Sequence, residues 1–345
     1  MAGLALLLRA SANRVYGDAA AGLAAAELRV LGPHLPGLSV DAPVRTRLGG
    51  VDYLVIDAAG PLDARALAVL SQLSSLHALF DIGADGRLAP QLITPRAVLD
   101  EDIVSIQRYA GKTNEAFTHL LVNVALGATE GGFERLLGGE RLGLLDPACG
   151  RGTALNRAAL YGMDAYGIEI DERDVEAYVH FLGTWLKAKR LKHAIDRATL
   201  RKARESPAHR AVVTYGPGKD RSQHHRIEVV HDDTVRALDH LRARSIDLLV
   251  CDLPYGVHHG SRPSSGQLDR RPEALLAAAL PVWAAVLRPG AGVALGWNRR
   301  TLARTRLVEL VRQAGLIVPT PDDEGFVHQV DRSITRDVLV AARPA

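Results

Sequence analysis

Acidic residues in this sequence end successive apolar runs, where carboxylates could bind the sugar and base of a nucleoside. The segment 146–153, Asp-Pro-Ala-Cys-Gly-Arg-Gly-Thr, follows one apolar run and precedes a helical pattern. Gly150 and Gly152 allow the backbone to approach a ligand closely, and the helix start presents backbone N–H groups. Glu169 ends the next run, 23 residues after the first acid, where it can accept hydrogen bonds from ribose hydroxyls. Asp232 ends a third run and can accept from an adenine amino group.

The glycine pattern differs from the dinucleotide fingerprint. Leu155 stands where that fingerprint has its third glycine, which argues against NAD. A single acid after a strand is typical of a solvated strand end, but three acids and a glycine turn at successive strand ends indicate a cofactor site. The predicted cofactor-binding residues are Asp146, Ala148, Gly150, Gly152, Glu169 and Asp232.

A fourth apolar run ends in Asp252-Leu253-Pro254-Tyr255-Gly256. With DPACGRGT and YGIEID before it, and IQRYAGKTNEAFTHLLVNVAL further upstream, the sequence resembles class I methyltransferases with a D/N-P-P-Y motif. It is most similar to the RNA N-methylases that modify guanine N2 in tRNA. The resemblance spans roughly Tyr109 to the C-terminus and implies S-adenosylmethionine as cofactor. It adds Thr113 and Asn114 to the cofactor-binding residues, because the upstream segment helps to close over the methionine end.

The resemblance also implies how the acceptor motif acts. A base amine is a poor nucleophile, and two acceptors on its hydrogens, the Asp252 carboxylate and the backbone carbonyl of residue 253, aim its lone pair at the methyl group. Leu253 replaces the first proline of the motif, but a carbonyl needs no proline ring, and Pro254 keeps Leu253 extended. Tyr255 would stack on the flipped base. Catalysis is then mainly positioning, and these four residues are the predicted catalytic set.

Other functions remain open at the level of sequence. A DNA adenine or cytosine N-methyltransferase and an N-methyltransferase of a small-molecule amine are the alternatives within the class. Protein glutamine methylation fits less well because those enzymes resemble the Asn form of the motif, and the intact acids argue against a binding module with a degenerate pocket. Cys149 and Cys251 are expected to be small buried residues, and no Cys/His spacing indicates a metal.

The net charge of +3 is unevenly distributed. Residues 183–226 contain 12 Lys and Arg against 3 Asp and Glu, while the remaining residues carry 30 against 36. Charge runs are often solvated helix faces, but a basic block in an acidic protein favours a polyanion as partner. We expect RNA, by resemblance tRNA, to contact a partly amphipathic helical stretch here; the predicted contacts are Lys187, Lys189, Arg190, Lys192, Arg201 and Lys202. No protein partner is indicated.

The elements that must position these residues follow a regular rhythm after residue 100. Strands are expected at 141–146, 164–171, 226–234, 245–252 and 290–298, helices at 154–161, 175–182, 274–287 and 305–315, and a strand pair at 326–343. This α/β pattern predicts a doubly wound parallel sheet, which the resemblance makes the Rossmann-like class I methyltransferase sheet. The polar segment 257–273 is expected to be a loop over the target base.

Residues 1–100 are predicted to form a separate small α/β or α+β domain, and residues 101–345 the methyltransferase domain with a basic insertion at 183–226. The first domain has expected strands at 3–10 and 51–58 and helices at 18–32 and 62–80, and an auxiliary, RNA-positioning role. The apolar start ends at Arg9 and lacks the basic region of a signal peptide. The uncharged run 274–287 is too short for a membrane span, so a cytoplasmic protein is expected.

Overall fold

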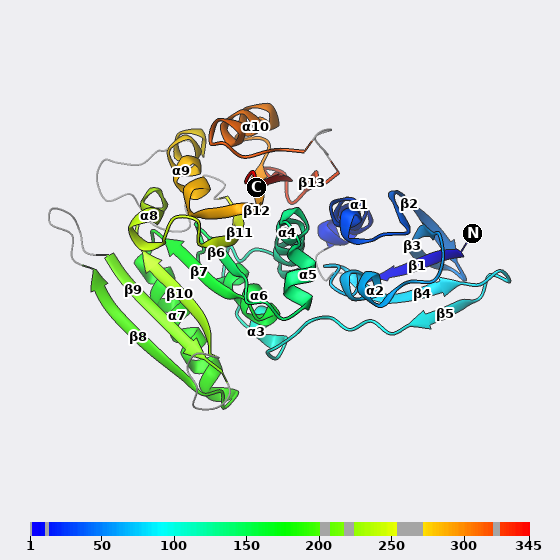
Figure 1. Ribbon diagram of the computed structural model, residues 1–345, viewed down its shortest axis with the longest axis horizontal. Helices are drawn as coiled ribbons and strands as arrows, with labels where there is room; N and C mark the ends of the chain where they lie inside the picture. The colour runs from blue at the N-terminus through cyan, green and yellow to red at the C-terminus, as the bar shows by residue number, and fades with distance from the viewer. Residues whose placement is uncertain (1, 11–13, 201–207, 217–223, 254–271, 320–324) are drawn as a thin grey trace.

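The computed structural model describes residues 2–10, 14–200, 208–216, 224–253, 272–319 and 325–345 (Figure 1). Four of the predicted site residues, Arg201, Lys202, Pro254 and Tyr255, lie outside these ranges. So does most of the loop expected at 257–273.

The N-terminal residues form a five-stranded antiparallel sheet in the order β2-β3-β1-β4-β5. Its elements are β1 (Ala2–Leu8), α1 (Arg14–Leu31), the 3-10 helix η1 (Gly32–His34), β2 (Leu38–Leu48), β3 (Val51–Ala58), α2 (Ala64–Leu70), β4 (Leu76–Ile82) and β5 (Leu88–Gln91). The helix expected over 62–80 is wrong beyond Leu70. The prediction was based on leucines at helical spacing. In the structure, the chain after α2 turns through Ser71–Ser75 and continues as strand β4, which pairs with β1.

The remaining described strands form a nine-stranded sheet in the order β13-β14-β12-β11-β6-β7-β10-β9-β8. Neighbours from β12 to β10 are parallel, whereas β14, β13, β9 and β8 are added by antiparallel pairing. The strands are β6 (Gly143–Asp146), β7 (Asp164–Glu169), β8 (His193–Leu200), β9 (Ala208–Tyr215), β10 (His225–His231), β11 (Ile246–Asp252), β12 (Leu287–Asn298), β13 (His328–Gln329) and β14 (Thr335–Ala342). The doubly wound sheet predicted from the sequence is confirmed.

Helices cover both faces of this sheet. They are α3 (Asp102–Ser105), α4 (Glu115–Ala128), α5 (Gly132–Leu137), α6 (Thr153–Tyr161), α7 (Glu172–Ala188), the 3-10 helix η3 (Thr234–Arg236), α8 (Ala237–His240), α9 (Pro272–Val286) and α10 (Arg304–Gln313). Alternating residues of β11 point to opposite cores: Leu248 and Val250 pack with α4, α6 and α7, while Leu249 and Cys251 pack with α8, α9 and α10. Two buried faces explain why these strands are nearly continuous apolar runs.

The basic insertion is a β-hairpin rather than the helical stretch expected from the sequence. Helix α7 ends at Ala188, and β8 pairs with β9, which in turn pairs with β10. β8 lies at the edge of the sheet, and its residues 196–199 are exposed. A strand with little apolar burial carries no clear period-two pattern, so its spacing was wrongly interpreted as helical.

Helix α4 joins the two sheets through a continuous core and a buried polar network. In Figure 1 α4 lies between the two sheets, and α1 and α2 lie on the side of α4 that faces the N-terminal sheet. The Glu27 carboxylate of α1 accepts hydrogen bonds from the Ser74 backbone (3.0 Å) and from Asn123 Nδ2 of α4 (2.6 Å). The Tyr161 hydroxyl of α6 donates to Asn123 Oδ1 (2.8 Å). The N-terminal unit is therefore fixed to the helix that begins beside Thr113.

Replacing Glu27 by glutamine is expected to reduce the pH dependence of stability. Burial raises the pKa of Glu27 from 4.5 to about 7, so the folded state holds this proton to higher pH and stability falls as pH rises between those values. The glutamine amide stays neutral, accepts from Asn123 and donates to the Ser74 hydroxyl. It should remove up to about 1.4 kcal/mol per pH unit of that fall. Urea unfolding at pH 5 and pH 8 measures the difference; an equal fall in E27Q would contradict it.

Within the described ranges, every helix is too short or too polar to cross a bilayer.

Candidate functional site

The predicted site residues meet at one edge of the large sheet. Asp146, Glu169 and Asp252 end the parallel strands β6, β7 and β11, and Asp232 follows β10. The order β10-β7-β6-β11 places these four carboxyl ends side by side. The switch in chain direction falls between β6 and β11, the position where sheets of this kind bind their ligands.

The glycine loop between β6 and α6 has the tight geometry that its sequence predicted. Gly150 and Gly152 both have positive φ, +49° and +76°, a conformation that glycine adopts without strain. A Cβ on Gly152 would lie 2.3 Å from the buried Tyr178 ring, whereas one on Gly150 would meet nothing within 4 Å. The loop therefore packs closely on its Gly152 side and is open at Gly150, as a nucleoside-binding loop requires.

Glu169 supports the loop from the neighbouring strand. Its carboxylate accepts hydrogen bonds from the backbone N–H of Gly150 (2.8 Å) and of Asp171 (2.9 Å), and burial raises its pKa. Asp146 is 6% exposed and accepts from the Ala148 N–H (3.2 Å). Burial, with the nearby charges of Glu169 and Asp252, raises the pKa of Asp146 to about 8. A ligand that brings positive charge would relieve this concentration of carboxylates.

Asp232 is placed at the same edge and is held by a histidine. Its backbone N–H donates to the Glu169 carbonyl (3.0 Å), and its Oδ2 is 2.7 Å from His240 Nε2 of α8. Asp233 has a local role, because its side chain accepts from the Val235 N–H and caps η3. Asp232 therefore lies beside Glu169 at this edge, with its carboxylate close to His240 and 3.6 Å from Arg236.

Asp252 is restrained by residues from three other elements. The Thr113 hydroxyl, just before α4, donates to Asp252 Oδ2 (2.9 Å), and the Arg336 guanidinium of β14 lies 3.4 Å from the same oxygen. The Leu253 N–H donates to the Gly296 carbonyl of β12 (2.8 Å). The first residue of the acceptor motif thus has a fixed carboxylate, and Leu253 continues the ladder with β12.

Thr113 and Asn114 were predicted together as cofactor residues, and the structure gives them different contacts. Thr113 binds the acceptor-motif carboxylate. Asn114 is the N-cap of α4, and its Oδ1 accepts from the backbone N–H of Ala116 (2.9 Å) and of Phe117 (3.2 Å). A capping side chain of this kind stabilises the helix start, and no described contact of Asn114 reaches the glycine loop.

Sequence reasoning missed Arg336 and the aromatic residue beneath it. The guanidinium lies over the Phe117 ring at 4.4 Å, and its side chain is 8% exposed. The next residue, Asp337, is also buried and pairs with Arg304 (2.6 Å). An Arg-Asp pair directly before the apolar run VLVAA in the same strand was the available signal, because buried charges in a strand require partners from other elements.

The two cysteines are buried, and burial raises the pKa of both thiols well above the usual range. A protonated buried thiol is a weak nucleophile, in line with the packing role predicted for Cys149 and Cys251. The described residues contain no group of three or more His, Cys, Asp or Glu arranged to hold a metal.

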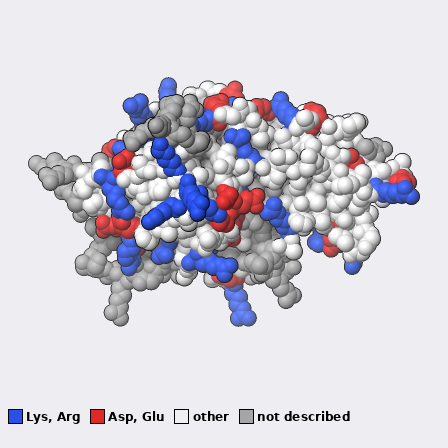
Figure 2. Space-filling model, turned by 90° about the horizontal axis from the view of Figure 1, so that it is seen from below, with Lys and Arg blue, Asp and Glu red and all other residues white. Residues whose placement is uncertain are grey.

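The predicted RNA contacts that the structure describes, Lys187, Lys189, Arg190 and Lys192, lie away from this edge. β9 pairs antiparallel with β10, and β8 pairs antiparallel with β9. β8 therefore runs in the same direction as β10 and begins at the edge of the sheet opposite the acids. Its eight residues span about 25 Å. Lys187, Arg190 and Lys192 are exposed beside that far end. Lys189 is held by Asp100 (2.8 Å) and Asp102 (2.7 Å). Figure 2, seen from below, shows Lys and Arg side chains gathered near the middle beside acidic ones.

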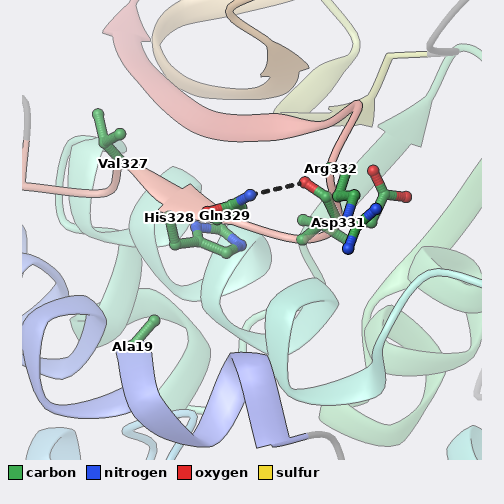
Figure 3. Close-up of a pocket in the computed structure, with 7 residues that line it drawn as sticks. Ala19, Val327, His328, Gln329, Asp331 and Arg332 are labelled. Atoms are coloured by element: carbon green, nitrogen blue, oxygen red, sulfur yellow. Dashed lines mark hydrogen bonds between the residues drawn. The ribbon is translucent and has the colours of Figure 1, made fainter.

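An open hollow lies between α1 and the β13 hairpin (Figure 3). It is lined by Ala19, Val327, His328, Gln329, Val330, Asp331 and Arg332 and measures about 570 Å³. The His328 ring, which packs against Phe117 at 5.4 Å between centroids, connects the hollow to the site. The hollow borders the acceptor side and does not include the glycine loop.

Fold and site together define a class of protein. Five parallel strands lie in the order β10-β7-β6-β11-β12 and are followed by the antiparallel β14. The glycine loop follows β6, the first of these strands in the chain, and Glu169 ends β7, the second. This is the class I methyltransferase sheet expected from the motifs.

The comparison with protein families agrees. Residues 139–293 match the family model described as RMKL-like, methyltransferase domain. The chain is accordingly a methyltransferase that uses S-adenosylmethionine, as the sequence predicted. A search of curated proteins finds no match.

Several solved structures resemble this one. TrmN from Thermus thermophilus is 14% identical, with 99% of this chain and 100% of that chain covered and a TM-score of 0.44. A TehB-like SAM-dependent methyltransferase from Corynebacterium glutamicum is 13% identical, with coverage of 61% and 85% and a TM-score of 0.35. An rRNA methylase from Streptococcus thermophilus is 11% identical, with coverage of 59% and 89% and a TM-score of 0.35.

Proposed function

We propose that this protein transfers the methyl group of S-adenosylmethionine to an exocyclic amine of an RNA base, guanine N2 in tRNA. The observation that carries the proposal is the position of Asp252. It ends β11, directly beside β6 and the glycine loop. The reaction needs a protein group here that accepts a hydrogen bond from the base amine, one strand away from the bound methyl donor.

The cofactor would be held by the residues predicted for it. Glu169 would accept from the ribose hydroxyls, Asp232 from the adenine amine, and the open face of Gly150 would admit the nucleoside. The cofactor supplies an electrophilic methyl group on a cationic sulfonium. The buried carboxyl groups of Asp146 and Glu169 would supply negative charge to such a cation once they are ionised.

S-adenosylmethionine binding is expected to release a proton and to tighten as pH rises through about 8. The pKa of Asp146, raised to about 8 in the unliganded protein, means that its carboxyl is largely protonated at neutral pH. A cationic ligand favours the ionised form, so below that pH the affinity should increase up to about tenfold per pH unit. Calorimetry in buffers of different ionisation enthalpy counts the proton. In D146N the pH dependence should disappear; a wild-type affinity that is flat from pH 6 to 8 would refute the linkage.

The Asp252 carboxylate and the Leu253 carbonyl would accept hydrogen bonds from the two N–H groups of the target amine and so direct its lone pair toward the methyl group. The methylated nitrogen would then release one proton. The geometry acts by positioning, and no covalent intermediate with the protein is needed. Pro254 and Tyr255, outside the described residues, complete the proposed motif. The N-terminal unit, fixed to α4, would act as an auxiliary domain that places the RNA.

RNA is proposed as the substrate because the motif suits base amines and the insertion is strongly basic. Lys187, Arg190 and Lys192 would contact phosphates remote from the target base, since they lie at the far edge of the sheet. The variant K187E/R190E/K192E is therefore expected to weaken RNA binding. The slope of log K against log salt concentration should become shallower by the equivalent of up to about three phosphate contacts. Methylation of an isolated nucleoside should be unchanged. Arg197, which pairs with Glu176 (2.6 Å), provides the control R197E. An unaltered salt slope would remove the insertion from the RNA interface.

The substrate class is tested by label transfer. Wild-type protein is incubated with methyl-labelled S-adenosylmethionine and, separately, with total RNA, DNA or a small-molecule extract. The proposal expects label in RNA alone. Label only in DNA would indicate the DNA N-methyltransferase, and label only in the extract would indicate a small-molecule amine as acceptor.

A further inference from the structure

Arg336 is an unusual residue for the interior of a strand. It is buried in β14, and its register partner in β12 is Asn298. Its guanidinium lies against the Phe117 ring and 3.4 Å from Asp252 Oδ2. Burying a charged pair costs solvation free energy that its attraction often fails to offset. Stability alone is therefore a poor reason for this contact, and its location at the acceptor motif suggests a functional one.

The same carboxylate oxygen also accepts a hydrogen bond. Thr113 Oγ1 donates to Asp252 Oδ2 at 2.9 Å, so Arg336 and Thr113 approach Oδ2 from two different elements. The other oxygen, Oδ1, lies on the Gly296 side: a Cβ on Gly296 would be 3.1 Å from Oδ1 and 3.2 Å from the Phe117 ring. The plane of the carboxylate is thereby defined by β14, by the segment before α4 and by β12.

Charges around Asp252 explain why a cation is placed there. Asp146 of β6 and Asp252 repel one another, which contributes to the raised pKa of Asp146. The Cys251 thiol and the His328 ring of β13 also lie within the field of Asp252. Arg336 provides the positive charge facing Oδ2 that offsets this repulsion, and Phe117 orients the guanidinium by stacking on it.

We propose that Arg336, together with Thr113, is a positioning residue that orients the Asp252 carboxylate toward the methyl-acceptor amine. Both residues contact Oδ2, and together they fix the orientation of the Asp252 side chain at the end of β11. This inference rests on the proposed function, because it assigns the carboxylate to the acceptor. Arg336 acts through Asp252 and makes no contact with the glycine loop among the described residues, so its removal should affect the transfer step rather than cofactor binding.

The test compares R336M with R336K and with the matched control R304M. Arg304 is also a buried arginine, stacks on Trp297 (5.5 Å) and pairs with Asp337. Single-turnover methyl transfer to the substrate found for the wild type is measured at saturating cofactor and substrate. R336M should be slower by about 10–100-fold, because the carboxylate loses the cation that restrains Oδ2, with an unchanged Kd for S-adenosylmethionine in calorimetry. R336K should recover part of the rate. R304M should lower the Tm and leave the rate within about twofold.

Coupling to Asp252 provides a second measurement. In the D252N background, which is expected to keep residual transfer, R336M should cause no further loss, because its partner has already been neutralised. If R336M does not fold, T113V against T113S tests the same assignment: T113V should be slower by about tenfold, and T113S, which keeps the hydroxyl, should recover most of that loss. The inference is overturned if R336M or T113V has full activity. It is also overturned if R336M slows transfer in D252N as much as it does in the wild type. Failure of the proposed function is a different result: the wild-type protein would then methylate no base amine, before any variant is compared.

Discussion

Replacing Asp252 by alanine is expected to reduce methyl transfer by at least about 10³-fold, because the acceptor amine loses the group that directs its lone pair. Binding of S-adenosylmethionine should be preserved, since the glycine loop, Glu169 and Asp232 do not depend on this carboxylate for their hydrogen bonds. Rates are measured by transfer of labelled methyl to the substrate, and binding by calorimetry of the same preparation.

The control for this variant is D252N. Alanine leaves Arg336 buried without the carboxylate at Oδ2, which lowers stability, whereas asparagine keeps the shape and one acceptor oxygen. D252N should therefore have a higher Tm and more residual transfer than D252A. Turnover of D252A near the wild-type rate would show that the acceptor amine is held elsewhere.

Replacing Gly152 by alanine is expected to have the largest effect on folding and cofactor binding together. The positive φ of +76° and a Cβ position 2.3 Å from Tyr178 impose both backbone strain and overlap. Tyr178 cannot retreat easily, because it is fully buried and its hydroxyl donates to Asn156 (3.0 Å). We expect a loss of about 2–5 kcal/mol in the free energy of unfolding. Cofactor binding should be lost as well.

Gly150 provides the matched comparison within the same loop. Its φ is also positive, but a Cβ there would meet nothing within 4 Å. G150A should therefore lose only about 1–2 kcal/mol and fold, with any further effect confined to the affinity for S-adenosylmethionine. Thermal unfolding and calorimetry of both variants separate the two contributions. Equal stability of G150A and G152A would contradict the packing described for the loop.

The sequence predicted the large sheet well because its strands are buried on both faces. Runs such as 246–252 have no polar face, and the glycine turn after Asp146 can only follow a strand and begin a helix. Since parallel strands end at a common edge, the meeting of Asp146, Glu169 and Asp232 followed from the order of the elements alone. These are local signals combined with one topological rule.

The errors occurred where pairing partners are distant or where burial is slight. Residues 76–82 became a strand because β1 lies beside them, and residues 193–200 because β9 does, although their own patterns suited helices. The contact of Thr113 with Asp252 joins residues 139 positions apart, and that of Arg336 comes from the last strand. No spacing in the chain encodes such contacts. They depend on how α4 and the C-terminal hairpin pack against the sheet.

The most direct test of the account is nucleoside mass spectrometry of tRNA treated with S-adenosylmethionine that carries a deuterated methyl group. The account predicts that wild-type protein places the label on the exocyclic N2 of guanosine and that D252A, which still binds the cofactor, places none. Label on a ring carbon or a ribose oxygen, or label transferred equally by D252A, would contradict the assignment of this site to amine methylation.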